Sequence, residues 1–140
     1  TILGYSIGVK QMYGNGYVLC GNSTEFLDPV FSSGVTLATY SGLLAAKLTY
    51  QQLSGKQVDW ETDYENEVKK GVNVFRNYVQ GWYNGDLQTI FFADEINPEI
   101  KKQICSVLAG YVWDTTNPFI KKHKTILPTL AKVVRLKQSI

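Results

Sequence analysis

Charged side chains are almost absent from the first third of the chain. The 14 basic and 12 acidic residues make 26 charges, and the first 46 positions contain only Lys10, Glu25 and Asp28. Six of the 12 glycines lie within the first 34 residues. A segment this poor in charge and rich in glycine is usually buried, or lies against a ligand or another chain segment. We therefore expect the first third to be buried, or to lie against a ligand or another chain segment.

The composition of the whole chain is that of a packed domain. Apolar residues make up 44% of the 140 residues and charged residues 19%, which is the balance of a globular core. No apolar run approaches the roughly 18 to 20 residues of a membrane-spanning helix, so we expect a soluble, cytoplasmic protein without a membrane partner. The net charge of +2 is too small to indicate nucleic-acid binding.

The sequence offers few residues for metal or covalent chemistry. His123 is the one histidine and lies among lysines, with no cysteine or carboxylate at ligand spacing, so we expect no metal site. No serine and aspartate pair with it by motif. Cys20 and Cys105 do not form a CxxC pair and are expected to be buried, unpaired thiols.

The N-terminal pattern predicts a short β-hairpin. Residues from Ile2 to Met12 favour extended structure, and the Asn-Gly pair in Tyr13-Gly14-Asn15-Gly16 is a strong hairpin signal. Residues 17–20 are expected to form a buried strand. Residues 21–33 have no clean period and contain Asp28-Pro29, which disfavours helix, so a loop is expected there.

Helical periodicity dominates the rest of the chain. Helix starts are marked by a capping residue or a proline: Ser32 or Ser33 before Gly34, then Asp59, Asn97-Pro98, Asn117-Pro118 and Pro128. The first helix is expected to stop at Gly55, and residues 87–93 are either helical or irregular. The fold class is therefore mainly α (α+β), a short N-terminal β-hairpin followed by four or five helices.

The C-terminal 24 residues contain six basic residues and no acidic residue. They could form a surface for an anion or an acidic partner. A solvated helical face is the commoner explanation for such a run.

The stretch from Gly21 to Val35 combines the features of an anion-binding turn. An irregular loop with Asp28-Pro29 leads into Ser32-Ser33-Gly34 at the start of the first long helix. A helix N-terminus presents free backbone N–H groups and the positive end of the helix dipole, which both favour a negative charge or an electron-rich ring edge. An ordinary helix cap is an equally simple explanation. The glycines nearby do not have the GxGxxG spacing of a dinucleotide fingerprint.

Residues 21–46 resemble the C-terminal flavin-contacting motif of the FAD-dependent halogenases. They are also similar to the related monooxygenases and dehydrogenases with the p-hydroxybenzoate-hydroxylase-type fold. The family pattern is a strand, Gly-Asp-Ala-Ala, Asp-Pro, Ser-Ser-Gly or Ser-Thr-Gly, and a long helix, and the chain matches it at Gly21, Asp28-Pro29 and Ser32-Ser33-Gly34. Residues 75–87 and 98–118 resemble the helical C-terminal region of halogenase-like oxidoreductases.

The resemblance implies a C-terminal fragment of a Rossmann-like FAD-binding fold. Residues 1–55 would be the C-terminal end of the FAD-binding domain, comprising the hairpin, the flavin loop and the long helix. Residues 56–140 would be a helical C-terminal region. The opening Thr-Ile-Leu has no initiator methionine, which agrees with this expectation. The family's GxGxxG, tryptophan-containing signature and catalytic lysine cannot be assigned in this segment, so we name no catalytic residue.

The resemblance also implies FAD as the cofactor. Its contacts would be Gly21, Asn22, Asp28, Pro29, Ser32, Ser33 and Gly34. Asn22 stands where the family usually has an aspartate that hydrogen-bonds the ribityl chain, and asparagine still offers an acceptor. Pro29 matches the residue beside the isoalloxazine, and the backbone amides of residues 32–34 match those that face the flavin pyrimidine edge. In halogenases this neighbourhood, here Ser33 and Gly34, also holds the halide.

The function implied is an FAD-dependent oxidoreductase, most simply a halogenase-like enzyme acting through reduced FAD and dioxygen. Its partners would be a small-molecule substrate such as an aromatic compound, a halide and a flavin reductase. The isolated chain is expected to be inactive and to self-associate. The alternatives are an FAD-dependent monooxygenase or dehydrogenase, or a non-enzymatic helical module that binds a partner through exposed aromatic residues.

Overall fold

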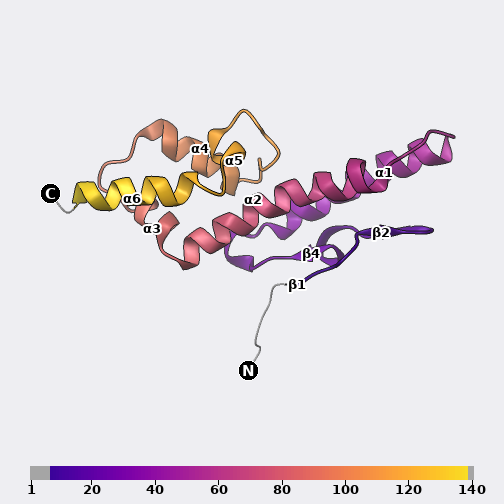
Figure 1. The fold of residues 1–140 in the computed structure, drawn as a ribbon, viewed down its shortest axis with the longest axis horizontal. Helices are drawn as coiled ribbons and strands as arrows, with labels where there is room; N and C mark the ends of the chain where they lie inside the picture. Colours follow the sequence, from indigo (N-terminus) through magenta and orange to yellow (C-terminus); the bar gives the residue numbers. More distant parts are fainter. Residues whose placement is uncertain (1–6, 139–140) are drawn as a thin grey trace, which may run out of the picture. The chain divides into compact units, whose positions relative to one another are not determined.

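The computed structural model describes residues 7–138, and Figure 1 shows the order of their helices and strands. The extended structure expected for residues 2–6 lies outside this range. The chain forms two compact units, one up to Val72 and one from Asn73 onward.

The predicted hairpin is confirmed in the first unit. Strand β2 (Tyr13–Gly14) pairs antiparallel with β3 (Tyr17–Val18), and Asn15-Gly16 forms the loop between them. Gly16 has a φ of 80°, a conformation that glycine adopts without steric cost. The expectation that residues 17–20 are buried is wrong at Tyr17, which is 55% exposed, because its ring lies over Gly14 at the surface of the hairpin.

The segment expected to be a loop, residues 21–33, contains short ordered elements. Strand β4 (Glu25–Phe26) pairs antiparallel with β1 (Ile7–Gly8). A 3₁₀ turn lies on each side of β4, η1 (Gly21–Ser23) before it and η2 (Pro29–Phe31) after it. The loop prediction is therefore wrong, because the pairing partner of β4 is distant in the sequence and local periodicity does not reveal it.

Helix α1 (Gly34–Leu53) begins and ends close to the predicted positions. It is apolar on two opposite faces. The buried face consists of Leu37, Ser41, Ala45 and Leu48. The other face exposes Val35, Leu43, Tyr50 and Leu53. The outer face of this charge-poor helix is therefore apolar although it is in contact with solvent.

A π-helical turn, η3 (Trp60–Glu65), continues directly into α2 (Asn66–Tyr83). Asp59 caps it as predicted, because its carboxylate accepts hydrogen bonds from the amides of Thr62 and Glu61. Hydrogen bonds from the Thr62 amide and hydroxyl and from the Glu61 amide lower the pKa of Asp59.

Two residues of η3 hold the N-terminal segment of the first unit. The Tyr64 hydroxyl donates to the Leu19 carbonyl at 2.6 Å, and burial raises the pKa of that hydroxyl. The Glu65 carboxylate accepts from the Met12 amide at 2.8 Å and forms an ion pair with Lys69. Burial opposes ionisation of Glu65, but the bonds from Lys69 and Met12 and the Lys69 charge together lower its pKa.

In the second unit, α2 is followed by α3 (Asp86–Phe91), α4 (Pro98–Leu108), α5 (Pro118–Lys121) and α6 (Ile126–Gln138). The described residues therefore form six α-helices rather than the four or five expected, and α5 has only four residues. Asn97 and Asn117 cap α4 and α5 as predicted. The ambiguous stretch 87–93 is largely helical. Cys105 on α4 is exposed rather than buried, Cys20 in the first unit is half-buried, and both thiols are unpaired.

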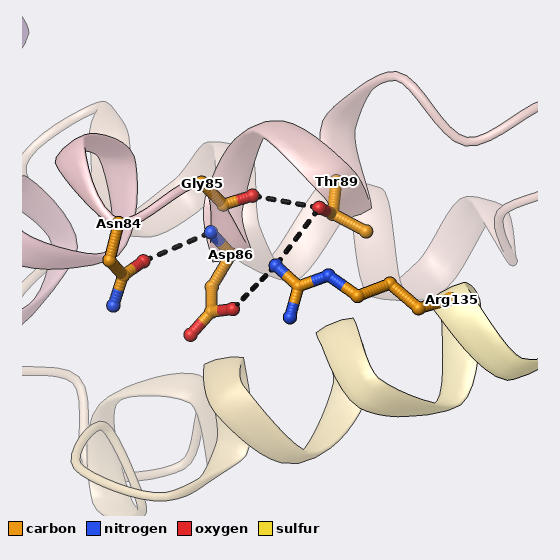
Figure 2. Close-up of polar contacts among 5 residues, drawn as sticks. All are labelled: Asn84, Gly85, Asp86, Thr89 and Arg135. Carbon is orange, nitrogen blue, oxygen red and sulfur yellow. Dashed lines mark hydrogen bonds and ion pairs between the residues drawn. The ribbon is translucent and has the colours of Figure 1, made fainter.

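A polar clamp joins α3 to α6 (Figure 2). Arg135 donates to the Asp86 carboxylate at 2.8 Å and lies 3.2 Å from the Thr89 hydroxyl. The Thr89 hydroxyl in turn donates to the Gly85 carbonyl, and the Asp86 amide donates to the Asn84 side chain. The clamp holds α6 with Leu127 and Ala131 fully buried.

Replacing Glu65 by glutamine should lower the free energy of unfolding by about 1–2 kcal/mol at about pH 7, because a charge-assisted bond to a buried amide is lost. The folded pKa of Glu65 lies below the unfolded value, so this contribution is present at neutral pH and disappears as the pH falls through the folded pKa. Urea unfolding measures the difference between the two proteins. The exposed Glu61→Gln substitution is the control, and a difference unchanged at about pH 3 would contradict the account.

Candidate functional site

Six of the seven residues proposed to contact a cofactor line one pocket in the first unit. The pocket has a volume of about 230 Å³. Its walls come from the chain between η1 and the first turn of α1. The six residues are Asn22, Asp28, Pro29, Ser32, Ser33 and Gly34.

Gly21, the seventh residue, does not line the pocket but fixes η1 against α1. Its amide donates to the Ser41 hydroxyl at 2.8 Å, and that hydroxyl donates to the Leu37 carbonyl at 2.6 Å. Gly21 has a φ of 59°, and an added Cβ would lie 3.0 Å from the Cβ of Ala38 and 3.3 Å from its Cα. Both the conformation and the close approach therefore require glycine.

Asp28 and Pro29 build the turn η2 at the pocket wall. The Asp28 carboxylate accepts from the Val30 amide at 2.9 Å, and Pro29 occupies the first position of the turn. Aspartate at the cap and proline directly after it are favoured because they satisfy and pre-set the first turn. Asp28 thus shapes the site, while Pro29 is exposed at its edge.

The backbone conformation changes from left-handed to right-handed where the chain enters α1. Ser32 has φ 52° and ψ 34°, in the left-handed region, and Ser33 returns to right-handed values of −66° and −16°. Such an alternation turns successive N–H groups toward one concavity, a backbone nest that binds anions. Within residues 7–138, Ser32 is the one non-glycine residue with a positive φ. Strain of this kind, about 1 kcal/mol or more, concentrates at functional sites.

Two of the expected backbone donors have no acceptor in the part of the chain that the structure describes. The amides of Ser33 and Gly34 make no hydrogen bond there, and the Ser33 side chain makes no capping bond. The first bond at the start of α1 runs from the Leu37 amide to the Ser33 carbonyl at 3.0 Å. The Ser32 amide instead donates to the Pro29 carbonyl at 2.9 Å, so this third amide already has an acceptor within the chain.

Asn22 lies beside this helix start although twelve positions separate it from Gly34 in the sequence. A Cβ placed on Gly34 would be 3.4 Å from the Asn22 side-chain oxygen. Asn22 is exposed, so its amide can meet a ligand. Asn22, Ser33 and Gly34 therefore line the same pocket.

Glu25 was not among the expected site residues, yet it lines the same pocket and is only 8% exposed. Its carboxylate packs over Gly8, where a side chain would collide with it. The signal that could have found Glu25 is its isolation, because it is one of three charges in the first 46 residues. The apolar wall of the pocket includes Leu37 and Val35.

Among the described residues, no cluster of histidine, cysteine and carboxylate groups could hold a metal ion. Within the same range, no helix combines the length and apolar character needed to cross a bilayer.

Comparison with known proteins gives partial matches. No family model matches the chain. It is 29% identical over 111 residues to a 1H-pyrrole-2-carbonyl-(peptidyl-carrier protein) chlorinase from Pseudomonas fluorescens, covering 78% of this chain and 24% of that protein. It is 31% identical over 68 residues to a flavin-dependent halogenase from Armillaria mellea, covering 49% of this chain and 13% of that protein.

A solved flavoprotein/dehydrogenase from Cytophaga hutchinsonii is 53% identical, with a TM-score of 0.93, over 96% of this chain and 33% of that chain. The chain therefore spans about a quarter or less of these halogenating enzymes and a third of the flavoprotein. The resemblance inferred from residues 21–46 is confirmed by these matches.

Gly21→Ala should destabilise the chain by about 2–3 kcal/mol, because it combines a left-handed backbone with a collision against α1. Gly16→Ala is the matched control, since Gly16 also has a positive φ but no atom within 4 Å of an added Cβ; it should cost only about 1 kcal/mol. Urea unfolding followed by circular dichroism measures both values. Equal losses would mean that the packing of Gly21 on α1 is not needed.

Proposed function

From its homology to flavin-dependent halogenases and to a flavoprotein/dehydrogenase, we propose that the chain is the C-terminal part of an FAD-dependent oxidoreductase of the halogenase-like branch. Residues 1–55 form the C-terminal end of its Rossmann-like FAD-binding domain. Residues 56–140 form its helical C-terminal region. The substrate is a small electron-rich molecule, and halide and a flavin reductase are the further partners.

The observation that carries this proposal is the pair of amides without acceptors at Ser33 and Gly34. They lie at the N-terminus of a 20-residue helix, in a left-handed then right-handed turn that lines a pocket. Reduced flavin carries negative charge at its pyrimidine edge, and a helix N-terminus with free N–H groups stabilises such charge. The side chain of Ser33, at the capping position, accepts no hydrogen bond from the first turn of α1.

The pocket residues fit FAD by the chemistry of their donors and acceptors. Ser33 and Gly34 would donate to the electron-rich edge of the ring, or to a halide at the same place. Asn22 would bind the ribityl hydroxyls through its amide, and Pro29 would lie beside the ring. Bound FAD would supply electron transfer to dioxygen, while these residues position the ring and hold its charge.

A dehydrogenase or monooxygenase of the same superfamily is the second candidate. The observation in its favour is that the chain is 53% identical to the flavoprotein/dehydrogenase but only 29% identical to the chlorinase. The anion-binding turn serves all three activities, because each passes through reduced flavin. A helical module without enzymatic activity would leave the turn from Asp28-Pro29 to Gly34 without a role.

A chimera tests the flavin proposal. The chain replaces the matching third of the C. hutchinsonii flavoprotein, a substitution that the 53% identity and TM-score of 0.93 make feasible. The purified chimera should retain flavin, measured by its visible absorbance. Val35→Asp should then weaken flavin binding by about tenfold or more, because it places a carboxylate at the first turn of α1.

Val35→Asn is the matched neutral control and should bind flavin as the unmodified chimera does. Asparagine removes the same apolar side chain as aspartate, and a carboxylate at a helix N-terminus stabilises the helix, so a loss specific to aspartate would reflect the added charge rather than lost packing or unfolding. A folded chimera without flavin, or equal binding by the two variants, would contradict the proposal.

The isolated chain should show no measurable affinity for FAD. Most contacts to the cofactor would come from the two thirds of the flavoprotein that this chain does not cover. A fluorescence titration of FAD with the 140-residue chain measures this directly. Micromolar binding would prove the expectation wrong.

The isolated chain should also self-associate through α1. The outer face of that helix exposes Val35 and Leu53 at 77% and 84%, with Leu43 and Tyr50 between them, an apolar surface that in a longer protein would be covered. Sedimentation velocity should show concentration-dependent assembly, and Leu43→Lys should shift it toward the monomer. Gln51→Lys adds the same charge at another exposed position and should have little effect. A chain that stays monomeric at high concentration would refute this expectation.

A further inference from the structure

An apolar groove of about 560 Å³ lies in the second unit. None of its lining residues belongs to the proposed flavin pocket. It is formed by α4, α5 and α6. Its main lining residues are Ile100, Phe119, Lys122, Ile126, Leu130 and Val133.

Helix α6 has one apolar face against its own unit and another facing this groove. Leu127 and Ala131 are buried, and the Arg135–Asp86 clamp keeps that face on α3 (Figure 2). The groove face carries Ile126, Leu130 and Val133, at the i, i+4 and i+7 spacing of a helical stripe. Val133 is 44% exposed, and Ile126 and Leu130 are half-buried, so the described part of the unit covers the stripe only in part.

One lysine lines the groove, and it lies in a basic part of the sequence. Residues 115–140 contain five lysines and Arg135 but no acidic residue. Lys122 lines the groove, and its sequence neighbours Lys121 and Lys124 are exposed. Arg135 is paired with Asp86. Glu99, in the first turn of α4, is an acidic residue that directly precedes the lining residue Ile100 in the sequence.

This charge decides between occupants. A second copy bound face to face would bring the same lysines together, and like charges across an interface are strongly unfavourable. A flat anionic bilayer would meet the lysines but would not fill a groove lined by residues of three helices. An amphipathic helix with acidic flanks would satisfy both the apolar stripe and the lysines, as in other helix-in-groove complexes.

We propose that this groove binds an amphipathic helix of a partner protein. The apolar residues of that helix lie along Ile126, Leu130 and Val133. Its acidic residues face Lys122 and the neighbouring lysines. The site is independent of the flavin proposal, since it uses other residues and needs no cofactor.

Two synthetic helical peptides test the proposal on the 140-residue chain by isothermal titration calorimetry. Both carry leucines at i, i+4 and i+7, and the flanking positions are glutamate in one and glutamine in the other. The glutamate peptide should bind about tenfold more tightly than the glutamine peptide, and added salt should reduce the difference. Lys122→Glu should abolish the preference, and Val133→Arg should weaken binding of both peptides.

Lys56→Glu, an exposed change in the first unit, is the matched charge control and should leave binding unchanged. Absence of binding, equal binding of the two peptides, or a preference that survives Lys122→Glu would overturn the proposal. Vesicles containing phosphatidylserine form the second arm. Tighter binding to vesicles than to the glutamate peptide, lost in Lys122→Glu, would show a membrane surface instead.

Discussion

The contact between Gly21 and α1 determines the geometry of the candidate site. The amide of Gly21 binds the Ser41 hydroxyl, which is itself bound to the Leu37 carbonyl one turn earlier. No side chain fits between Gly21 and Ala38, so η1 rests directly on the helix. This packing brings Asn22 beside Gly34 and closes the pocket from one side. If η1 separated from α1, the asparagine and the two unpaired amides would no longer line the same pocket.

Helix α1 links the site to the rest of a larger protein. Its inner face packs under η1, and its outer face is apolar and exposed. A 20-residue helix with Lys47 as its one charged residue is not suited to solvent on either face. The structural match covers only a third of the C. hutchinsonii flavoprotein, so a longer protein of this kind would have material to cover that face. The same helix would then bind the cofactor at its N-terminus and the remainder of the domain along its side.

The parts of the fold that sequence predicts are those specified by neighbouring residues. A helix cap acts within one turn, so the helix starts are predictable from the capping residues Asp59, Asn97 and Asn117. The hairpin is predictable for the same reason, because its turn is specified by the adjacent pair Asn15-Gly16. The pairing of β1 with β4 and the role of Glu25 depend on residues far apart in the chain. For the site, the sequence predicts that residues 28–34 form a turn that leads into a helix. It does not predict the hydrogen bond from the Ser32 amide to the Pro29 carbonyl, because the left-handed backbone at Ser32 is one that serine seldom adopts.

In the proposed function, the backbone amides of Ser33 and Gly34 donate hydrogen bonds to a negatively charged group, as a backbone nest at a helix N-terminus can do. A crystal structure of the flavin-loaded chimera tests it most directly, through the distances from these two nitrogens to the nearest acceptor. The account predicts hydrogen-bond distances to the pyrimidine edge of the flavin or to a bound halide, about 2.9 Å to an oxygen or nitrogen acceptor. Two amides bonded instead to carbonyls of the protein would contradict it.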